Sequence, residues 1–248
     1  MVVAMPEPTI LATSGGYAPG VRSRLAFAPL VRHAVDLAGP DRSPRVCHVG
    51  TAGGDQSGFL ADFDQAARDA GFVASHLNLF TMPNVEDLEA HLLAQDVVWV
   101  GGGSVANLLA VWRVHGLDRI MRTVWEAGVV LAGVSAGSIC WHVGGTTDSF
   151  GPDLRPVDDA LALLPYANGV HYDSDAGRRP LMHTLVGAGT LPTAYCTDDG
   201  VGLVYRGTTM VEAVTELRGK GAYRVMRDAD GSGASEERIE PRQLPGAR

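Results

Sequence analysis

The stretch Val129-Val130-Leu131-Ala132-Gly133-Val134-Ser135-Ala136-Gly137 decides the fold. An apolar run that ends in small residues predicts a buried β-strand that turns sharply into a helix. Its last five residues match G-x-S-x-G, a pattern in which a serine sits on a strained strand-to-helix turn. A side chain at Gly133 or Gly137 would crowd that turn, and the N–H groups of the following helix would point at Ser135. The pattern alone is weak evidence for a nucleophile, because a serine that only caps a helix can occur in the same sequence pattern.

Short apolar runs ending in glycine alternate with segments of helical period in the part of the chain before this turn. Such alternation predicts an α/β fold, with a parallel sheet covered by helices on both faces. We expect strands at 9–13, 45–50, 71–77, 96–101 and 128–134, and helices at 23–37, 57–70, 85–93, 104–114 and 117–127.

The texture of the sequence changes after Ser135. Residues 144–175 are rich in turn-forming residues and are interpreted as site-building loop, followed by a short helix at 178–185. Alternating runs then suggest antiparallel strands added to one edge of the sheet. These strands are expected at 193–196, 200–206, 208–215 and 222–227. We expect one hydrolytic α/β domain over 1–248, ordered from about residue 9 to residue 227, with 228–248 as a flexible tail.

The composition excludes several classes of protein. With 46% hydrophobic and 19% charged residues the chain can bury a sizeable core. A net charge of −8 without basic runs argues against a nucleic-acid partner. Three cysteines without close spacing argue against a disulfide framework and against a bound metal. No apolar run suits a membrane, and the N-terminus lacks the pattern of a signal peptide. We therefore expect a cytoplasmic protein without a membrane partner; a homodimer remains open.

A second glycine cluster, Val100-Gly101-Gly102-Gly103-Ser104, ends one predicted strand and opens a helix. The carboxyl ends of neighbouring parallel strands face one crevice, so this loop is expected close to Ser135. The N–H groups of Gly102 or Gly103, together with that of Ala136, would form an oxyanion hole. A plain turn and a nucleotide-binding loop are the alternatives, but the spacing does not follow G-x-G-x-x-G.

Taken together, these motifs resemble the peptidase E and cyanophycinase family of serine peptidases. The resemblance implies a flavodoxin-like central sheet, similar to that of class I glutamine amidotransferases. It also implies hydrolysis of small peptides, typically dipeptides with N-terminal aspartate, without a cofactor. The stretches that carry it are Val100 to Leu109, Ala132 to Ser138, Thr146-Thr147-Asp148-Ser149 and Gly169-Val170-His171-Tyr172.

A nucleophilic serine needs a base, and the base needs a carboxylate that orients it. The family pattern implies that His171 is the base; His142 lies about 10 Å along a helix from Ser135, too far to serve. The pattern also implies Asp148 as the acid, in the chain order Ser, Asp, His. The local sequence departs slightly from the family's, which leaves other carboxylates open. The alternatives are Asp173, Asp175, Asp198 and Asp199. Of the remaining histidines, His183 is interpreted as a surface residue of a helix, and the others as structural: His33, His48, His76, His91 and His115.

An acidic substrate residue needs a cation in the site. Arg178 and Arg179 follow His171, and the family's substrate arginine falls at a similar distance, which favours Arg178. The alternative is that both arginines only keep the surface soluble. Other functions also remain open: a cyanophycinase-like β-aspartyl peptidase, another serine hydrolase such as an esterase, a cysteine glutaminase using Cys140, or a non-catalytic flavodoxin-like binding module.

Overall fold

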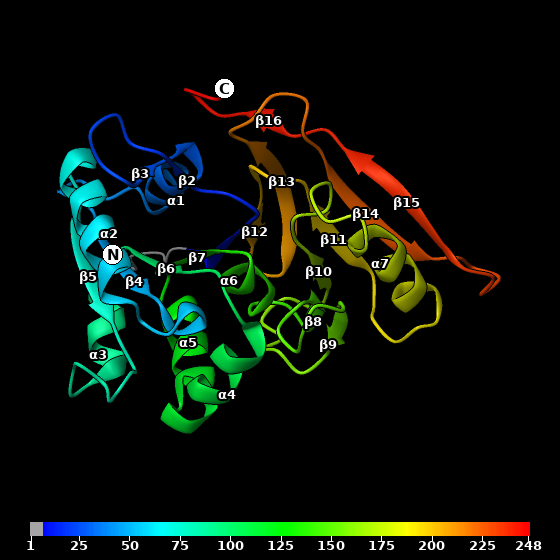
Figure 1. Ribbon diagram of the computed structural model, residues 1–248, viewed down its shortest axis with the longest axis horizontal. Helices are drawn as coiled ribbons and strands as arrows, with labels where there is room; N and C mark the ends of the chain where they lie inside the picture. The colour runs from blue at the N-terminus through cyan, green and yellow to red at the C-terminus, as the bar shows by residue number, and fades with distance from the viewer. Residues whose placement is uncertain (1–6) are drawn as a thin grey trace, which may run out of the picture.

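A computed structural model describes residues 7–248 (Figure 1). Residues 1–6, which carry much of the segment considered for a signal peptide, lie outside the described residues. Within the described part of the chain, none of the helices combines the length and the apolar character needed to cross a membrane.

A central sheet of eight strands carries the candidate elbow near its middle, in the order β16-β13-β12-β1-β7-β6-β4-β5. The strands from β1 to β5 in this order pair in parallel, and each lies within a residue or two of its predicted position. The predicted α/β class, with a parallel sheet flanked by helices, is therefore confirmed. These strands are β1 (Thr9–Thr13), β4 (Arg45–Val49), β5 (Val73–Leu77), β6 (Val97–Val100) and β7 (Val130–Val134).

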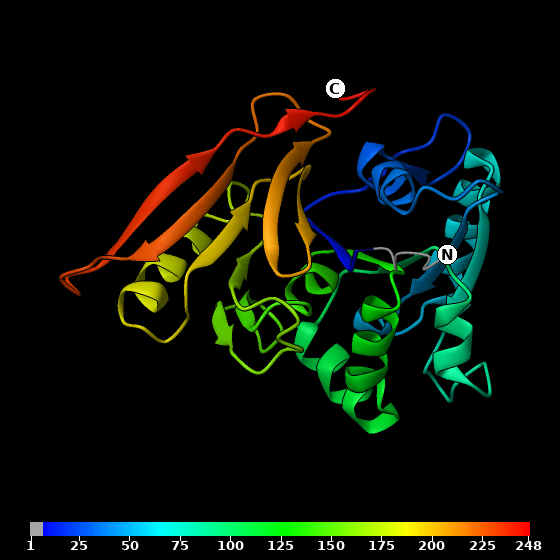
Figure 2. The ribbon, with the colours of Figure 1, turned by 180° about the vertical axis from the view of Figure 1, so that it is seen from behind.

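Helices cover both faces of this sheet (Figure 2). Successive side chains of a strand point to opposite faces, and here both sets are apolar and pack against helices. On one face Trp99 packs with Leu30 and Phe63, which belong to α1 (Pro29–Ala38) and α2 (Ser57–Ala70). On the other face Val98 and Val100 join a core that includes Leu108 and Trp112. The helices of this second face are α3 (Leu88–Leu93), α4 (Val105–His115), α5 (Leu117–Glu126) and the short α6 (Ala136–Ile139). A two-stranded ribbon, β2 (Tyr17–Ala18) with β3 (Ala26–Phe27), and a 3-10 turn, η1 (Thr51–Gly53), complete this half of the chain.

Antiparallel strands do extend the central sheet at one edge, as the sequence predicts, but only some of them. β12 (Val201–Arg206) pairs antiparallel with β1, and β13 (Thr209–Thr215) pairs antiparallel with β12. The short β16 (Arg242–Gln243) completes that edge. The other expected strands belong elsewhere.

A second sheet of six strands, which was not predicted from the sequence, lies beside the first (Figure 1). Three of its strands fall within the stretch interpreted as loop, and the expected strands near 193–196 and 222–227 join it rather than the central sheet. Strands of three or four residues containing glycine show no alternation, so their pattern resembles that of turns. The sheet runs β15 (Ala234–Ile239), β14 (Ala222–Arg227), β11 (Ala194–Thr197), β10 (Ala167–Gly169), β8 (Gly144–Thr147) and β9 (Arg155–Val157), and α7 (Arg178–Gly187) packs on it.

The C-terminal residues differ from the expected flexible tail. Residues 234–239 form β15, which pairs with β14 along its whole length. Its polar residues suit a sheet edge as well as a disordered tail, which is why composition misled the prediction. Glu236 accepts a hydrogen bond from the Tyr172 hydroxyl at 2.8 Å and pairs with Arg179, so β15 also anchors α7.

Two buried histidines make the stability of this fold sensitive to acid. His142 is fully buried, with Nδ1 2.9 Å from the Ser138 carbonyl oxygen and Nε2 3.2 Å from the Tyr205 hydroxyl. Burial lowers the pKa of His142 to about 4 and that of His48 to about 3. The unfolded chain takes up these protons below about pH 6.5, whereas the folded chain does not until the lower pKa is reached. The stabilisation is therefore complete above pH 6.5 and is lost as the pH falls toward 4.

We expect His142→Gln to flatten this dependence. Between pH 7 and pH 5 the wild-type free energy of unfolding should fall by about 2 kcal/mol more than that of the variant. Urea unfolding at pH 7, 6 and 5 measures both slopes. A variant that is uniformly less stable but keeps the wild-type slope would contradict this assignment.

Candidate active site

Ser135 occupies a strained turn between β7 and α6. Its backbone angles are φ 58° and ψ −114°, a conformation that costs a non-glycine residue energy and tends to mark functional sites. The Ser135 N–H donates to the Thr13 carbonyl oxygen at 3.0 Å. A Cβ on Gly133 would lie 2.7 Å from the Val100 carbonyl oxygen, and one on Gly137 would lie 2.7 Å from the Val100 carbonyl carbon. The two glycines are thus required for the steric reason given by the sequence.

The triple-glycine loop after β6 lies directly beside the serine. A Cβ placed on Gly102 would be 3.3 Å from the Ser135 Cβ. Among residues 7–248, neither Gly102 nor Gly103 donates its N–H to another residue. Ala136 begins α6, where the first N–H groups of a helix lack intrahelical partners. The predicted oxyanion donors therefore cluster around Ser135 with unused N–H groups.

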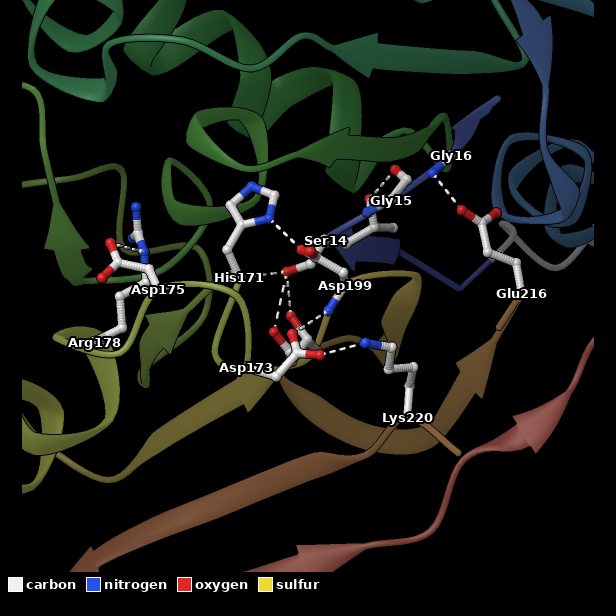
Figure 3. A network of polar contacts seen from close by, with 12 residues as sticks. Ser14, Gly15, Gly16, His171, Asp173, Asp175, Arg178, Asp199, Glu216 and Lys220 are labelled. Atoms are coloured by element: carbon white, nitrogen blue, oxygen red, sulfur yellow. Dashed lines mark hydrogen bonds and ion pairs between the residues drawn. The ribbon is translucent and has the colours of Figure 1, made fainter. Parts of the chain in front are cut away.

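His171 comes from the second sheet, in the loop that follows β10. Its φ of 53° is left-handed, and its N–H donates to the Ser14 hydroxyl oxygen at 3.1 Å. On its ring, Nδ1 lies 2.6 Å from Oδ1 of Asp199 (Figure 3). β10 and β11 run parallel as neighbours, so the residues that follow them meet at the same edge of the sheet. The topology thus brings His171 and Asp199 together.

A cavity of about 450 Å³ joins the two sheets at this point and is called the polar cavity here. It brings together most of the residues that the sequence singled out, including Ser135, His171 and Arg178. It is open to solvent and almost free of apolar side chains, which suits a charged substrate. Its lining is Gly103, Ser104, Ser135, Asp148, Ser149, His171 and Arg178.

The carboxylate in contact with the histidine ring is Asp199 and not Asp148, which the family pattern favoured. Asp148 lines the polar cavity and is exposed, but no hydrogen bond joins it to His171 within residues 7–248. β8 and β11 both pair in parallel with β10, one on each side, so Asp148 and Asp199 flank His171. Sequence order cannot distinguish the two sides. Asp199 was among the alternatives that the sequence left open.

Two further residues hold Asp199, and no sequence pattern indicated this role for them. The Asp199 N–H donates to Oδ1 of Asp173 at 2.9 Å, and Asp173 forms an ion pair with Lys220 (Figure 3). Burial opposes ionisation of Asp173, but the Lys220 ammonium and the Asp199 N–H outweigh it and hold the Asp173 pKa below its usual value. Asp173 is therefore an anionic anchor for the Asp199 loop.

Arg178 begins α7 and is only 6% exposed, yet it lines the polar cavity. Its Nη1 donates to the Thr146 carbonyl oxygen at 2.9 Å, and Nε lies 3.3 Å from Oδ2 of Asp175 without hydrogen-bond geometry. The guanidinium thus retains unused donors beside the candidate nucleophile. Arg179, by contrast, stacks on the rings of Tyr172 and Tyr223 at 4.6 and 4.4 Å and does not line the cavity.

The remaining candidates have other surroundings. His183 pairs with Glu236, 3.1 Å away, and His142 is buried against Tyr205. Cys140 is fully buried, and burial raises the pKa of its thiol well above the usual value, which makes it a poor nucleophile. Among the residues described, no group of three or more histidine, cysteine or carboxylate side chains is arranged to hold a metal ion.

Comparisons with known proteins agree on one family. The model of Peptidase family S51 matches residues 10–213. An uncharacterised peptidase, YgaJ, of Bacillus subtilis is 41% identical over 183 residues, 74% of this chain and 78% of that protein. A peptidase E of Shewanella denitrificans is 26% identical over 157 residues, 61% of this chain and 65% of that protein.

Two solved structures share the fold. A peptidase from an acI-B1 actinobacterium superposes with a TM-score of 0.68 at 14% identity, covering 96% of each chain. A candidate peptidase E protein from Listeria monocytogenes gives a TM-score of 0.58 at 16% identity, covering 83% of this chain and 97% of that one.

Proposed function

Because the chain belongs to peptidase family S51, whose members are serine-type peptidases, we propose that it hydrolyses dipeptides with N-terminal aspartate through Ser135, His171 and Asp199. One observation carries this proposal: a strained serine and a carboxylate-paired histidine line the same cavity. The name peptidase E, given to a Shewanella relative, and the name probable alpha-aspartyl dipeptidase, given to a Drosophila melanogaster protein 31% identical over 128 residues, agree with this substrate.

The proposed chemistry is acyl transfer in two steps. His171 removes the Ser135 proton, and Ser135 Oγ attacks the scissile carbonyl carbon. The N–H groups of Gly102, Gly103 and Ala136 stabilise the oxyanion, since they need no reorganisation to do so. His171 then gives its proton to the leaving amine, and water, activated by the same histidine, releases the acyl group. Asp199 keeps the imidazole oriented and stabilises its charge.

The polar cavity supplies opposite charges for the two charged groups of an N-terminal aspartate. Arg178 offers unused guanidinium donors to the substrate side-chain carboxylate, an interaction that is strong because both partners are ionised. Asp148 faces the same cavity and is the proposed partner of the substrate ammonium group. The presence of Arg178 and Asp148 in one cavity thus supports selection of a substrate whose first residue is acidic.

Replacing the cation tests this assignment. For Arg178→Met we expect kcat/KM for Asp-Leu to fall roughly 100-fold, the loss of charge-assisted hydrogen bonds, while the value for Asn-Leu changes little. Arg179→Met is the matched control, since that arginine lies outside the cavity and should leave the Asp-Leu to Asn-Leu ratio unchanged. Equal losses for both substrates in Arg178→Met, or no preference for Asp-Leu in the wild type, would overturn the proposed specificity.

A further inference from the structure

A second cavity is lined by the triple-glycine loop and by Val134, the residue before the candidate nucleophile. It has a volume of about 320 Å³ and differs from the polar cavity in being walled mainly by rings and aliphatic carbon. The two cavities share the loop, since Gly102 lines this one and Gly103 lines the other. We call it the aromatic pocket and define it by Tyr17, His48, Phe59, Leu60, Gly102 and Val134.

Two residues that line the aromatic pocket are neighbours of Ser135. Val134 immediately precedes the serine, and a Cβ on Gly102 would meet the Ser135 Cβ at 3.3 Å. A Cβ on Gly101 would lie 3.1 Å from Nε2 of His48. Because Gly101 and Gly102 have no side chains, the loop can pass closely between the His48 imidazole and Ser135.

The walls are ordered by aromatic contacts. The rings of Tyr17 and Phe59 pack edge to face with centroids 5.6 Å apart, and the His48 ring lies 5.1 Å from Phe59. Such surroundings favour an apolar or aromatic side chain, which gains both burial and ring contacts. Charged side chains would lose hydration here without a compensating ion pair.

Two side chains in this wall, Tyr17 through its hydroxyl and His48 through its ring nitrogens, have buried polar atoms without a hydrogen-bond partner within residues 7–248. His48 is 2% exposed, and neither of its ring nitrogens has a hydrogen-bond partner within residues 7–248. Buried polar groups are normally satisfied, so an unsatisfied one at a pocket wall points to a ligand. Burial, with a smaller contribution from His76, lowers the pKa of His48 to about 3, so the neutral ring offers one donor and one acceptor. A hydroxyl can use either.

We propose that the aromatic pocket binds the side chain of the residue on the leaving side of the scissile bond, and that it selects aromatic residues, tyrosine above phenylalanine. The proposal rests on the proposed function: a dipeptide has two side chains, and the acidic one is assigned to Arg178 in the polar cavity. The aromatic pocket lies on the triple-glycine loop next to Ser135, so we assign the remaining side chain to it. His48 is then a specificity-determining residue.

The test compares Asp-Gly, Asp-Phe and Asp-Tyr as substrates of the full chain. Burial of the ring should raise kcat/KM for Asp-Phe roughly 10- to 100-fold above that for Asp-Gly, and the hydroxyl should add about fivefold for Asp-Tyr. Leu60→Trp fills the pocket and should reduce the Asp-Tyr to Asp-Gly ratio to a few fold. Ala61→Trp, which adds the same bulk at the next, exposed position of α2, should leave the ratio unchanged. His48→Leu should bring the Asp-Tyr to Asp-Phe ratio to about one.

The outcomes distinguish a failure of the pocket assignment from a failure of the proposed function. Equal rates for Asp-Gly and Asp-Tyr would overturn the pocket assignment and leave the proposed function standing. A matching preference on the acyl side instead, measured with Phe-Gly and Tyr-Gly, would also overturn the leaving-side assignment. If no aspartyl dipeptide is cleaved, the proposed function fails. Saturation-transfer NMR with p-cresol then tests the pocket alone: binding to wild type but not to Leu60→Trp supports the pocket, and no binding overturns it.

Discussion

Ser135→Ala is expected to abolish peptide hydrolysis, with kcat falling by about 10⁴- to 10⁶-fold. The reason is that, within residues 7–248, no other hydroxyl or thiol combines the strained turn, the free N–H groups of the glycine loop and the histidine pair. The measurement is kcat for Asp-Leu with protein free of wild-type contamination. A variant that keeps more than a tenth of the rate would show that another group is the nucleophile.

The same variant separates chemistry from folding. Ser135 contributes little packing, and its backbone N–H to Thr13 is retained in alanine, so the thermal unfolding midpoint should shift by only a few degrees. A fluorophosphonate should label wild-type protein on Ser135 and leave Ser135→Ala unlabelled. Labelling at a different residue in the wild type would contradict the assignment independently of any peptide substrate.

Asp199→Asn is expected to lower kcat by about 10⁴-fold, because an amide cannot stabilise the imidazolium and favours the wrong tautomer of His171. The 2.6 Å contact between Asp199 Oδ1 and His171 Nδ1 carries this expectation. The second approximately isosteric variant, Asp148→Asn, is the matched control. It should lower kcat no more than about tenfold and act mainly on KM, since its proposed partner is the substrate ammonium group.

These two variants also discriminate between the sequence-based and the structure-based choice of acid. A larger loss of kcat in Asp148→Asn than in Asp199→Asn would restore the family-derived assignment and contradict the present one. Both aspartates flank the same histidine at strand ends, so any disturbance of the loops themselves should affect the two variants alike. The ratio of the two kcat values is therefore more informative than either alone.

The parallel strands of the central sheet were predictable, because a strand that is buried on both faces consists of consecutive apolar residues, as in Val97 to Val100. The elbow was predictable for a steric reason, since only glycine fits at 133 and 137. The second sheet was not, because strands such as β10 (Ala167–Gly169) are too short to show a period.

The aspartate that contacts His171 could be identified only from the pairing of the strands. Asp148, His171 and Asp199 follow three adjacent parallel strands, and a sequence gives the order of such strands along the chain but not their order in space. Arg178 could be proposed from its charge and position. The sequence could not show how its guanidinium is held. Arg178 donates to the carbonyl oxygen of Thr146, which is distant in the sequence, and this contact becomes visible only in the folded structure.

The end of β1 holds both the candidate nucleophile, Ser135, and its proposed base, His171. The Thr13 carbonyl oxygen receives the Ser135 N–H, and the hydroxyl of the next residue, Ser14, receives the His171 N–H and lies 2.6 Å from the Thr197 hydroxyl. Thr13, the last residue of β1, and Ser14, which follows it, thus set the separation between groups contributed by two sheets. Because neither hydrogen bond involves the outer strands of the second sheet, we expect those strands to tolerate substitutions that change substrate preference without altering the spacing of Ser135 and His171.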